Sequence, residues 1–247
     1  MNLLLTNDDG FDAEGLKVLA EILSEKHNVF IIAPDGNRSA VSHGISMRSD
    51  LTLKKIRENV WSCSGKPADC VIVALKSPFL PVKPDAVISG INHGANLGSD
   101  IIYSGTCAAS REAVLDGVPS CAVSLEYNDG KLEHFKSLAE FVSENLEKLF
   151  SLSKTGDDSS FININALSLP SYKGAVLTDV LANRKYDDRL EIICKDDEFI
   201  TRIEGGDLIH PYCQDSDTGL CKNGFVSVSV VRAEPYASKV DDISFSI

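Results

Sequence analysis

The stretch NLLLTNDDG at residues 2–10 joins an apolar run to a cluster of polar turn residues, which is typical of a buried strand followed by a turn. Apolar residues then recur at helical spacing between Leu16 and Leu23, and a second apolar run, VFII, follows at residues 29–32. Both runs are continuous rather than alternating, which indicates strands that are buried on both faces. Two such strands joined by a helix predict a parallel, right-handed βαβ unit.

The chain continues in the same way up to about residue 150. A polar loop spans residues 34–44, and broken alternation over residues 45–63 is consistent with antiparallel strands added to the sheet. We then expect, in order, a helix at 67–75, a buried strand at 86–89, a glycine-rich loop at 90–105, a helix at 106–115, a strand at 121–125 and an amphipathic helix from 135 to 149. This pattern predicts an α/β fold with a Rossmann-like, doubly wound and mostly parallel sheet.

Strand patterns dominate after a polar linker at residues 151–160. Short apolar runs occur at 161–164, 176–177, 190–193, 199–203 and 225–228. We therefore predict a catalytic core at residues 1–150, followed at residues 151–247 by sheet-completing strands and a β-rich oligomerisation arm. A single domain that contains both segments is the alternative. The arm, about residues 186–231, is predicted to contribute to a dimer or larger assembly, because a two-stranded ribbon is marginally stable alone.

The composition is that of an ordinary globular protein, with 247 residues of which 43% are hydrophobic and 24% are charged. The 24 Lys and Arg residues against 36 Asp and Glu residues give a net charge of −12, the wrong sign for binding polymeric nucleic acid. An acidic protein that binds a phosphate substrate needs a local device to offset repulsion. A bound cation or converging backbone amides would serve.

The cysteines and the hydropathy pattern bear on the compartment. Seven cysteines with no CxxC pair predict reduced thiols rather than a disulfide framework or a zinc ribbon. No apolar run reaches membrane-spanning length, and the first residues lack the pattern of a secretory leader. We expect a cytoplasmic protein without a membrane partner.

Polar residues follow the first two predicted strands, where open parallel sheets bind their ligands. Asp8 and Asp9 place two carboxylates side by side, and hard oxygen ligands of this kind suit Mg²⁺ or Mn²⁺ rather than zinc. A solvated turn is the alternative, because Asn, Asp and Gly are favoured in turns. After the second strand, Arg38 and Ser39 supply a guanidinium and a hydroxyl, which by themselves could equally be a surface charge and a turn residue.

The third polar segment, residues 89–106, is the most specific. Four glycines are interleaved there with Asn and Ser, so backbone amides can approach a ligand closely. The helix that begins near Thr106 points its positive end toward the same place. The segment therefore predicts a phosphate cradle, and helix N-capping by Ser104 or Thr106 is the alternative.

Several motifs occur together in the order seen in the SurE survival-protein family of metal-dependent nucleotidases, which the sequence resembles over residues 1 to about 125. They are NDDG at 7–10, NRS at 37–39, SG at 64–65 with PADCV at 67–71, the segment 89–97 and YSGT at 103–106. The resemblance implies one divalent cation per subunit, Mg²⁺ or Mn²⁺, held by Asp8, Asp9, Ser39 and Asn92. It implies that the phosphate lies near Asn96, Ser104, Gly105 and Thr106.

The resemblance also implies an activity and an assembly. The family hydrolyses nucleoside 5′- and 3′-monophosphates, and some members also trim short polyphosphate. Its fold is similar to a Rossmann-like sheet with a C-terminal extension that is used in dimers or tetramers. A nucleoside monophosphate is therefore the expected substrate.

We predict that Asp8, Asp9 and Asn96 carry the catalysis and that water attacks the phosphate directly. Covalent attack by Asp9 is less favoured, because aspartyl-phosphate phosphatases space their carboxylates as Asp-x-Asp. Arg38, His43 and His93 are possible substrate-proximal residues. For His93 a purely positional role in the loop is the alternative, and for His43 simple exposure.

Two other classes of protein place related residues after a first strand. A Mg²⁺-binding phosphorylation-switch module, similar to a receiver domain and without hydrolase activity, is the main alternative, but it needs an acceptor Asp at the end of the third buried strand, where this chain has Ser89-Gly90. A dinucleotide-binding domain needs Gly-x-Gly-x-x-Gly after strand one, where this chain has Asn-Asp-Asp-Gly. A nucleotidase is the better match.

Overall fold

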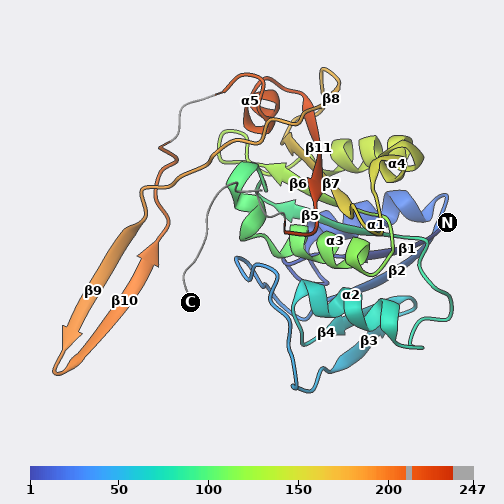
Figure 1. Ribbon diagram of the computed structural model, residues 1–247, viewed down its shortest axis with the longest axis horizontal. Coiled ribbons are helices and arrows are strands. Elements are labelled where there is room, and N and C mark those ends of the chain that lie inside the picture. The colour runs from blue at the N-terminus through green and yellow to red at the C-terminus, as the bar shows by residue number, and fades with distance from the viewer. Residues whose placement is uncertain (210–212, 236–247) are drawn as a thin grey trace, which may run out of the picture.

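The structure is a computed structural model that describes residues 1–209 and 213–235. Helices cover both faces of one central sheet, and a long β-hairpin projects away from this body (Figure 1). The α/β fold with a mostly parallel sheet that the sequence predicts is confirmed.

The described part of the chain forms a nine-stranded sheet in the order β3-β4-β2-β1-β5-β6-β7-β11-β8. Neighbours from β4 through β7 are parallel, whereas β3 and β11 run antiparallel to β4 and β7. The strands are β1 (Asn2–Thr6), β2 (Asn28–Pro34), β3 (Leu53–Arg57), β4 (Val60–Cys63), β5 (Ala86–His93), β6 (Ser120–Glu126), β7 (Ser160–Leu167), β8 (Ala175–Leu177) and β11 (Val226–Arg232).

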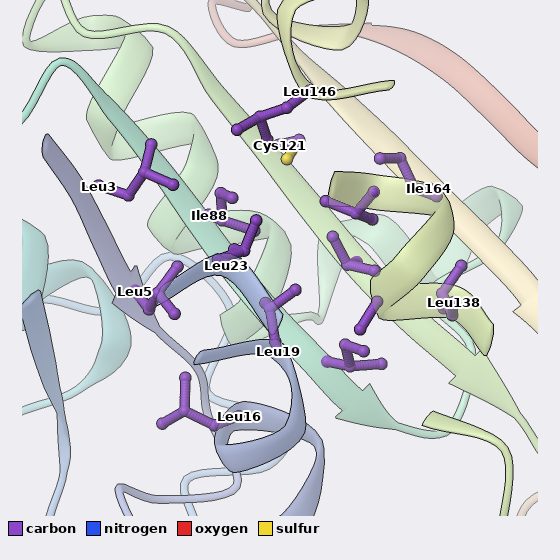
Figure 2. Packing of buried hydrophobic residues seen from close by; sticks show 14 of the residues in the cluster. Leu3, Leu5, Leu16, Leu19, Leu23, Ile88, Cys121, Leu138, Leu146 and Ile164 are labelled. Atoms are coloured by element: carbon purple, nitrogen blue, oxygen red, sulfur yellow. The ribbon is translucent and has the colours of Figure 1, made fainter. Parts of the chain in front are cut away.

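The helices pack in pairs on the two faces of the sheet. The helices are α1 (Glu14–Ser24), α2 (Pro67–Lys76), α3 (Gly105–Leu115), α4 (Phe135–Leu152) and α5 (Asp217–Lys222), with a short 3₁₀ helix, η1, at Gly98–Ile102. On one face, α1 and α4 bury Leu16, Leu19 and Leu138 against strand residues such as Leu5 and Ile88 (Figure 2). On the other face, α2 and α3 cover the alternate strand residues, including Leu4 and Val87. This double burial is the physical reason why the strand sequences are continuous apolar runs.

Three local features differ from the sequence expectation. Strand β5 continues through Gly90 to His93, so the loop before α3 is shorter than predicted. Residues 45–52 form no strand, so the antiparallel addition is confined to β3. Helix α5 was not predicted, because its six residues are too few to show a helical period.

The projecting hairpin consists of β9 (Arg189–Lys195) and β10 (Glu198–Glu204), and it has two unlike faces. Opposite residues in an antiparallel pair share a face. The pairings Ile203–Leu190 and Phe199–Cys194, with Thr201 opposite Ile192, therefore place apolar side chains on one face. Four of these side chains are more than half exposed: Leu190, Ile192, Phe199 and Ile203.

Within the described ranges, no helix combines the length and the apolar character that a membrane crossing requires. All seven cysteines are free thiols, five of them buried. Strands β7, β8 and β11, which come from the predicted second segment, extend the sheet that the first segment begins. Residues 236–247 of that segment lie outside the described residues.

Candidate active site

The C-terminal ends of β1, β2 and β5 and the first turn of α3 surround a hollow of about 290 Å³. Its lining comprises Asp8, Ser39, Ala40, Asn92, His93, Ala95, Asn96, Asp100, Tyr103, Ser104 and Tyr186. A hollow of about 280 Å³ between α4 and the β8–β11 edge has mostly apolar walls and contains no carboxylate. The first hollow is the candidate active site because it lies at the C-terminal ends of parallel strands, where open parallel sheets bind their ligands.

A tight turn after β1 fixes the two carboxylates. The Asn7 side chain accepts a hydrogen bond from the Gly10 amide at 3.1 Å and donates one to the Gly10 carbonyl at 2.9 Å. Gly10 has φ +113°, a left-handed conformation that favours glycine. The Arg38 amide donates to the Asp8 carbonyl at 2.6 Å, which ties this turn to the loop that follows β2.

The Asp8 carboxylate is buried against the first turn of α3. Its Oδ1 accepts a hydrogen bond from the Thr106 hydroxyl at 2.5 Å, and its Oδ2 accepts one from the Thr106 amide at 3.1 Å. A Cβ on Gly105 would lie 2.9 Å from both the Cβ and the Oδ2 of Asp8, so this close approach requires glycine. Burial raises the pKa of Asp8 to about 6, the hydroxyl of Thr106 acts against this shift, and the charge of Asp9 adds to it.

Asp9 is half-buried and anchors the end of β5. Its Oδ2 accepts a hydrogen bond from the His93 amide at 3.0 Å. This bond brings the end of β5, which carries Asn92, beside the acidic pair. Burial is the main reason why the pKa of Asp8 is raised, and the negative charge of Asp9 adds to this shift, so the two carboxylates interact electrostatically.

Ser39 and Asn92 add further oxygen atoms to the same hollow. Among the described residues, the Ser39 hydroxyl has no hydrogen-bond partner, while its amide is held by Asn37 at 2.8 Å. The Asn92 amide group donates to the Gly94 carbonyl at 2.8 Å, which leaves the side-chain oxygen free of partners in the described part of the chain. Three of the four predicted cation ligands, Asp8, Ser39 and Asn92, therefore line the hollow, whereas Asp9 is not part of its lining and is joined to it through the hydrogen bond from the His93 amide.

An irregularity in β5 places Asn92 and His93. The register between β5 and β6 shifts between Ser89 and Asn92. Gly90 lies in this shift with φ +139°, and a Cβ there would collide with the Val123 carbonyl. Bulges of this kind redirect side chains beside active sites. The sequence pattern predicts that Gly90 is a loop residue. In the structure Gly90 lies within β5, where it allows this strand to approach β6 closely.

Asn96 is held by polar side chains of two neighbouring strands. Its side-chain nitrogen donates to the Ser124 hydroxyl at 2.8 Å, and its amide donates to the Asn165 side chain at 2.8 Å. Its carbonyl accepts hydrogen bonds from Asn163 at 2.8 Å and from Asn165 at 3.1 Å. The side-chain oxygen of Asn96 has no partner among the residues described, so it is available to a ligand.

The predicted phosphate residues of α3 differ in their placement. The Ser104 side chain caps the helix by accepting from the Cys107 amide at 3.0 Å, and the residue lines the hollow. Thr106 is fully buried and is committed to Asp8. In the first turn this leaves the Gly105 amide, for which no hydrogen bond is found within the described chain. Fewer groups in this turn are available to bind an anion than its sequence implies.

Two predicted substrate-proximal residues point elsewhere. The Arg38 guanidinium binds Asp35 at 2.7 Å, and Arg38 is not part of the lining. His43 Nε2 lies 2.9 Å from a Glu112 carboxylate oxygen on α3, and His43 is not part of the lining either. The structure thus brings His93 into the hollow and holds Arg38 and His43 beside it.

Comparison with known proteins agrees with this arrangement. The profile of the family described as Survival protein SurE matches residues 3–187, which include every residue of the hollow. The chain belongs to the SurE family. Residues 3–187 also contain the strands from β2 to β8 and all of β1 except Asn2, whereas β11 of the same sheet lies beyond the matched residues.

Individual SurE proteins are similar over most of their length. A protein of Treponema pallidum (strain Nichols) named 5′-nucleotidase SurE is 42% identical over 190 residues, covering 74% of this chain and 99% of that protein. One of Clostridium botulinum (strain Loch Maree / Type A3) with the same name is 39% identical over 234 residues, covering 93% and 92%. The crystal structure of the SurE protein from Aquifex aeolicus superposes with a TM-score of 0.79 at 30% identity, covering 95% of this chain and 94% of that one.

His93 has an unusual environment in this SurE fold. Its ring packs against Phe135, with the ring centroids 5.1 Å apart. Its buried Nε2 atom has no hydrogen-bond partner among the described residues. A buried, unpaired nitrogen beside a ligand site is available to a substrate or a water molecule.

Some residues of the SurE site were missed by the sequence interpretation. Asp100, Tyr103 and Tyr186 line the hollow, and Asn163 and Asn165 support Asn96 from behind. The two asparagines could have been found, because they interrupt the buried apolar run FININAL of β7 at alternate positions. Tyr186 offers no such sign, because it is brought in from a segment outside the sheet.

Proposed function

We propose that this chain is a divalent-cation-dependent nucleotidase that hydrolyses nucleoside 5′- and 3′-monophosphates to the nucleoside and phosphate, and that short polyphosphate is a further substrate. The observation that carries the proposal is the hollow itself. It places the Asp8 carboxylate, which is followed in the sequence by Asp9, against the N-terminal turn of a helix, as a cation-assisted phosphate site requires. The names of the relatives, 5′-nucleotidase SurE, support the same class of activity.

The residues present fit a hard divalent cation, Mg²⁺ or Mn²⁺. The raised pKa of Asp8 reflects burial of a carboxylate beside which, in the described part of the chain, no cationic side chain neutralises the charge. Asp8, Asp9, Ser39 and Asn92 offer only oxygen atoms, and in the last two these atoms have no partner among the described residues. Bound there, one cation per subunit would supply charge neutralisation for the phosphoryl oxygens and orientation of the attacking water.

The protein's own residues then define how the phosphate is held. Asn96 lines the hollow, and the Gly105 amide, which follows the lining residue Ser104, has no hydrogen bond within the described chain; both groups would bind phosphoryl oxygens. Asp9 and the His93 amide keep the two sides of the hollow together. In the reaction a water oxygen attacks phosphorus, the bond to the nucleoside oxygen breaks, and that oxygen takes up a proton. Covalent attack by Asp9 stays the less favoured route.

A phosphorylation-switch module finds no support in the geometry. Such a module needs an acceptor Asp near the C-terminal end of the central strand, and β5 contains no Asp from Ala86 to His93. The acidic pair by itself is common to both classes. Hydrolysis of the substrate, rather than phosphorylation of the protein, is therefore the activity to test.

The test is release of inorganic phosphate from a panel of nucleoside 5′- and 3′-monophosphates and tripolyphosphate. The protein is first treated with EDTA, and Mg²⁺, Mn²⁺ or Zn²⁺ is then added back. We expect no release with EDTA and restored release with Mg²⁺ or Mn²⁺. Full turnover in metal-free buffer would overturn the cation proposal, and no release from any nucleotide with any cation would overturn the nucleotidase proposal.

We further propose a homodimer or homotetramer in the cytoplasm. The support for assembly is the apolar face of the β9–β10 hairpin, which is exposed in the single chain; the opposite face carries the Ile193–Ile200 pair between the charged residues Glu191, Lys195, Glu198 and Arg202. An exposed apolar ribbon of this kind is a site for protein association. Polymeric nucleic acid and membranes are not proposed as partners.

A further inference from the structure

We propose that Tyr103 and Tyr186 bind the nucleobase of the substrate, one on the helix side of the hollow and the other at the root of the projecting hairpin. The inference rests on the proposed nucleotidase function and adds the part of the site that distinguishes a nucleotide from other phosphate esters. It starts from the observation that both tyrosines line the same hollow as Asp8 and Ser104.

Tyr103 presents its aromatic ring from a rigid backbone. Its amide donates to the Asp100 carbonyl at 3.0 Å, and its carbonyl accepts from the Ser42 amide at 2.9 Å. The residue is 64% exposed, and no ring or cation packs on it within the described chain. An exposed ring on a fixed backbone at the edge of a polar hollow is a ready stacking surface for a base.

Tyr186 is held from the other side by a charged network. Its hydroxyl donates to Asp100 Oδ2 at 2.8 Å and accepts from Arg184 Nε at 3.0 Å, and the Arg184 guanidinium packs over the ring at 5.8 Å from its centroid. Burial raises the pKa of Tyr186 to about 12, so the hydroxyl keeps its proton and its bond to Asp100. The ring is therefore preorganised, which lowers the entropy lost when a ligand binds.

The position of Tyr103 in the chain sets the distance between base and phosphate. Tyr103 lies two residues before Gly105, whose amide is one of the proposed phosphate contacts. A nucleoside monophosphate has its phosphate and base at opposite ends of a ribose. A phosphate on the first turn of α3 therefore directs the base toward the tyrosine edge of the hollow rather than into the sheet, where the buried Thr6 and Ser89 leave no room.

The chain offers a matched control for this pair. Tyr127 lies close to the site, since its Cε2 is 3.9 Å from the position that a Cβ on Gly94 would occupy, and it is 48% exposed. It is nevertheless absent from the lining of the hollow. Replacement of Tyr127 thus tests the general effect of removing an exposed tyrosine near the loop.

The experiment compares AMP with ribose 5-phosphate, which carries the same phosphate ester and sugar but no base. Wild type, Tyr103→Ala, Tyr186→Ala and Tyr127→Ala are assayed with Mn²⁺ for kcat/KM on both compounds. We expect each of the first two variants to lose roughly 10-fold more on AMP than on ribose 5-phosphate, mainly through KM. Tyr127→Ala should keep the wild-type ratio.

Two further measurements separate base binding from support of the loop. Tyr103→Phe keeps the stacking ring and should restore the preference for AMP. Adenosine should compete with AMP in wild type and compete roughly 10-fold less well in Tyr103→Ala, while inorganic phosphate should inhibit both proteins alike.

The outcomes that overturn the inference are distinct from those that overturn the proposed function. Equal losses on AMP and on ribose 5-phosphate, or equal inhibition of wild type and Tyr103→Ala by adenosine, would show that the tyrosines do not bind the base. A wild-type protein that releases phosphate from neither compound would overturn the nucleotidase proposal, and the base site with it.

Discussion

The Asp8 carboxylate and Thr106 are 98 residues apart in sequence, yet two hydrogen bonds join them, from the Thr106 hydroxyl at 2.5 Å and from its amide at 3.1 Å. These bonds join the turn that follows the central strand β1 to the first turn of α3. The same carboxylate is the most buried member of the proposed cation site. Asp8 therefore serves both the fold and the site, and the two roles can be separated by experiment.

Thr106→Val should destabilise the metal-free protein. The substitution keeps the shape of the side chain but leaves Asp8 Oδ1 buried without its hydroxyl partner, which costs about 1–3 kcal/mol in the free energy of unfolding. Thr106→Ser retains the hydroxyl and is the matched control. Urea denaturation in EDTA measures both variants, and equal stability of the two would contradict the importance of this hydrogen bond.

The raised pKa of Asp8 predicts a pH dependence of stability in the absence of a cation. Its pKa is about 6 in the folded protein against an ordinary value of 3.8, so the folded state holds the proton more tightly than the unfolded state. Stability is therefore lost as the pH rises from about 4 to about 6, by an amount on the order of 3 kcal/mol, and the full penalty remains above pH 6.

The measurement is the difference in the free energy of unfolding between wild type and Asp8→Asn in EDTA. The asparagine does not titrate, and the other carboxylates are common to both proteins. As the pH rises through this interval, the free energy of unfolding of wild type should fall relative to that of Asp8→Asn. A difference that does not change between pH 4 and pH 7 would show that Asp8 titrates normally.

Asp9→Asn should separate function from stability. The asparagine oxygen can still accept the hydrogen bond from the His93 amide, and removal of the charge relieves the repulsion on Asp8. We expect the metal-free variant to be as stable as wild type or slightly more so, while turnover is abolished.

Thermal melting with and without Mn²⁺ checks this prediction. Wild type should gain stability with the cation, roughly 2.7 kcal/mol at about 100 times the dissociation constant, and the variant should gain much less. If Asp9 only supported the turn, the variant would lose about 1 kcal/mol and respond to Mn²⁺ as wild type does. A destabilised but active Asp9→Asn would overturn the site assignment.

The central strands could be predicted from the sequence because each is a continuous apolar run between polar turns. The runs that begin at Asn2 and Asn28 are confirmed as the parallel pair β1 and β2. The candidate site could be located from the same pattern, since polar residues such as Asp8 and Ser39 follow these strands. The structure brings them into one hollow, and their roles in binding and catalysis stay predictions.

The parts that could not be predicted depend on contacts between distant residues. The local sequence pattern places Gly90 in a loop. The reason for a glycine within a strand is its close approach to Val123, and this contact cannot be seen in the sequence. The partner of His43 is Glu112, 69 residues later, and nothing near either residue in the sequence points to that pairing. Tyr186 reaches the hollow because Arg184 and Asp100 hold it, and both contacts are tertiary.

Because the apolar face of the β9–β10 hairpin is exposed in the single chain, we predict that the protein in solution is larger than a monomer of 26.7 kDa. Phe199→Glu with Ile203→Glu places charge on the apolar face and should yield monomers at micromolar concentration, as measured by light scattering. Ile193→Glu with Ile200→Glu makes the same double change on the opposite face, which also carries charged residues, and should leave the assembly intact. A monomeric wild-type protein would rule out the proposal.

The hydrogen bonds around Asn96 have a consequence for the order in which the protein becomes active during its synthesis. Asn96 is positioned by Asn163 and Asn165, which the ribosome adds almost 70 residues later. A nascent chain that ends near residue 150 contains Asp8, Asp9 and Asn92 but not these partners. Its acidic pair can be in place while the opposite wall of the hollow is unsupported. Catalytic competence therefore arrives only with β7, and a fragment of residues 1–150 is expected to be inactive whether or not it folds.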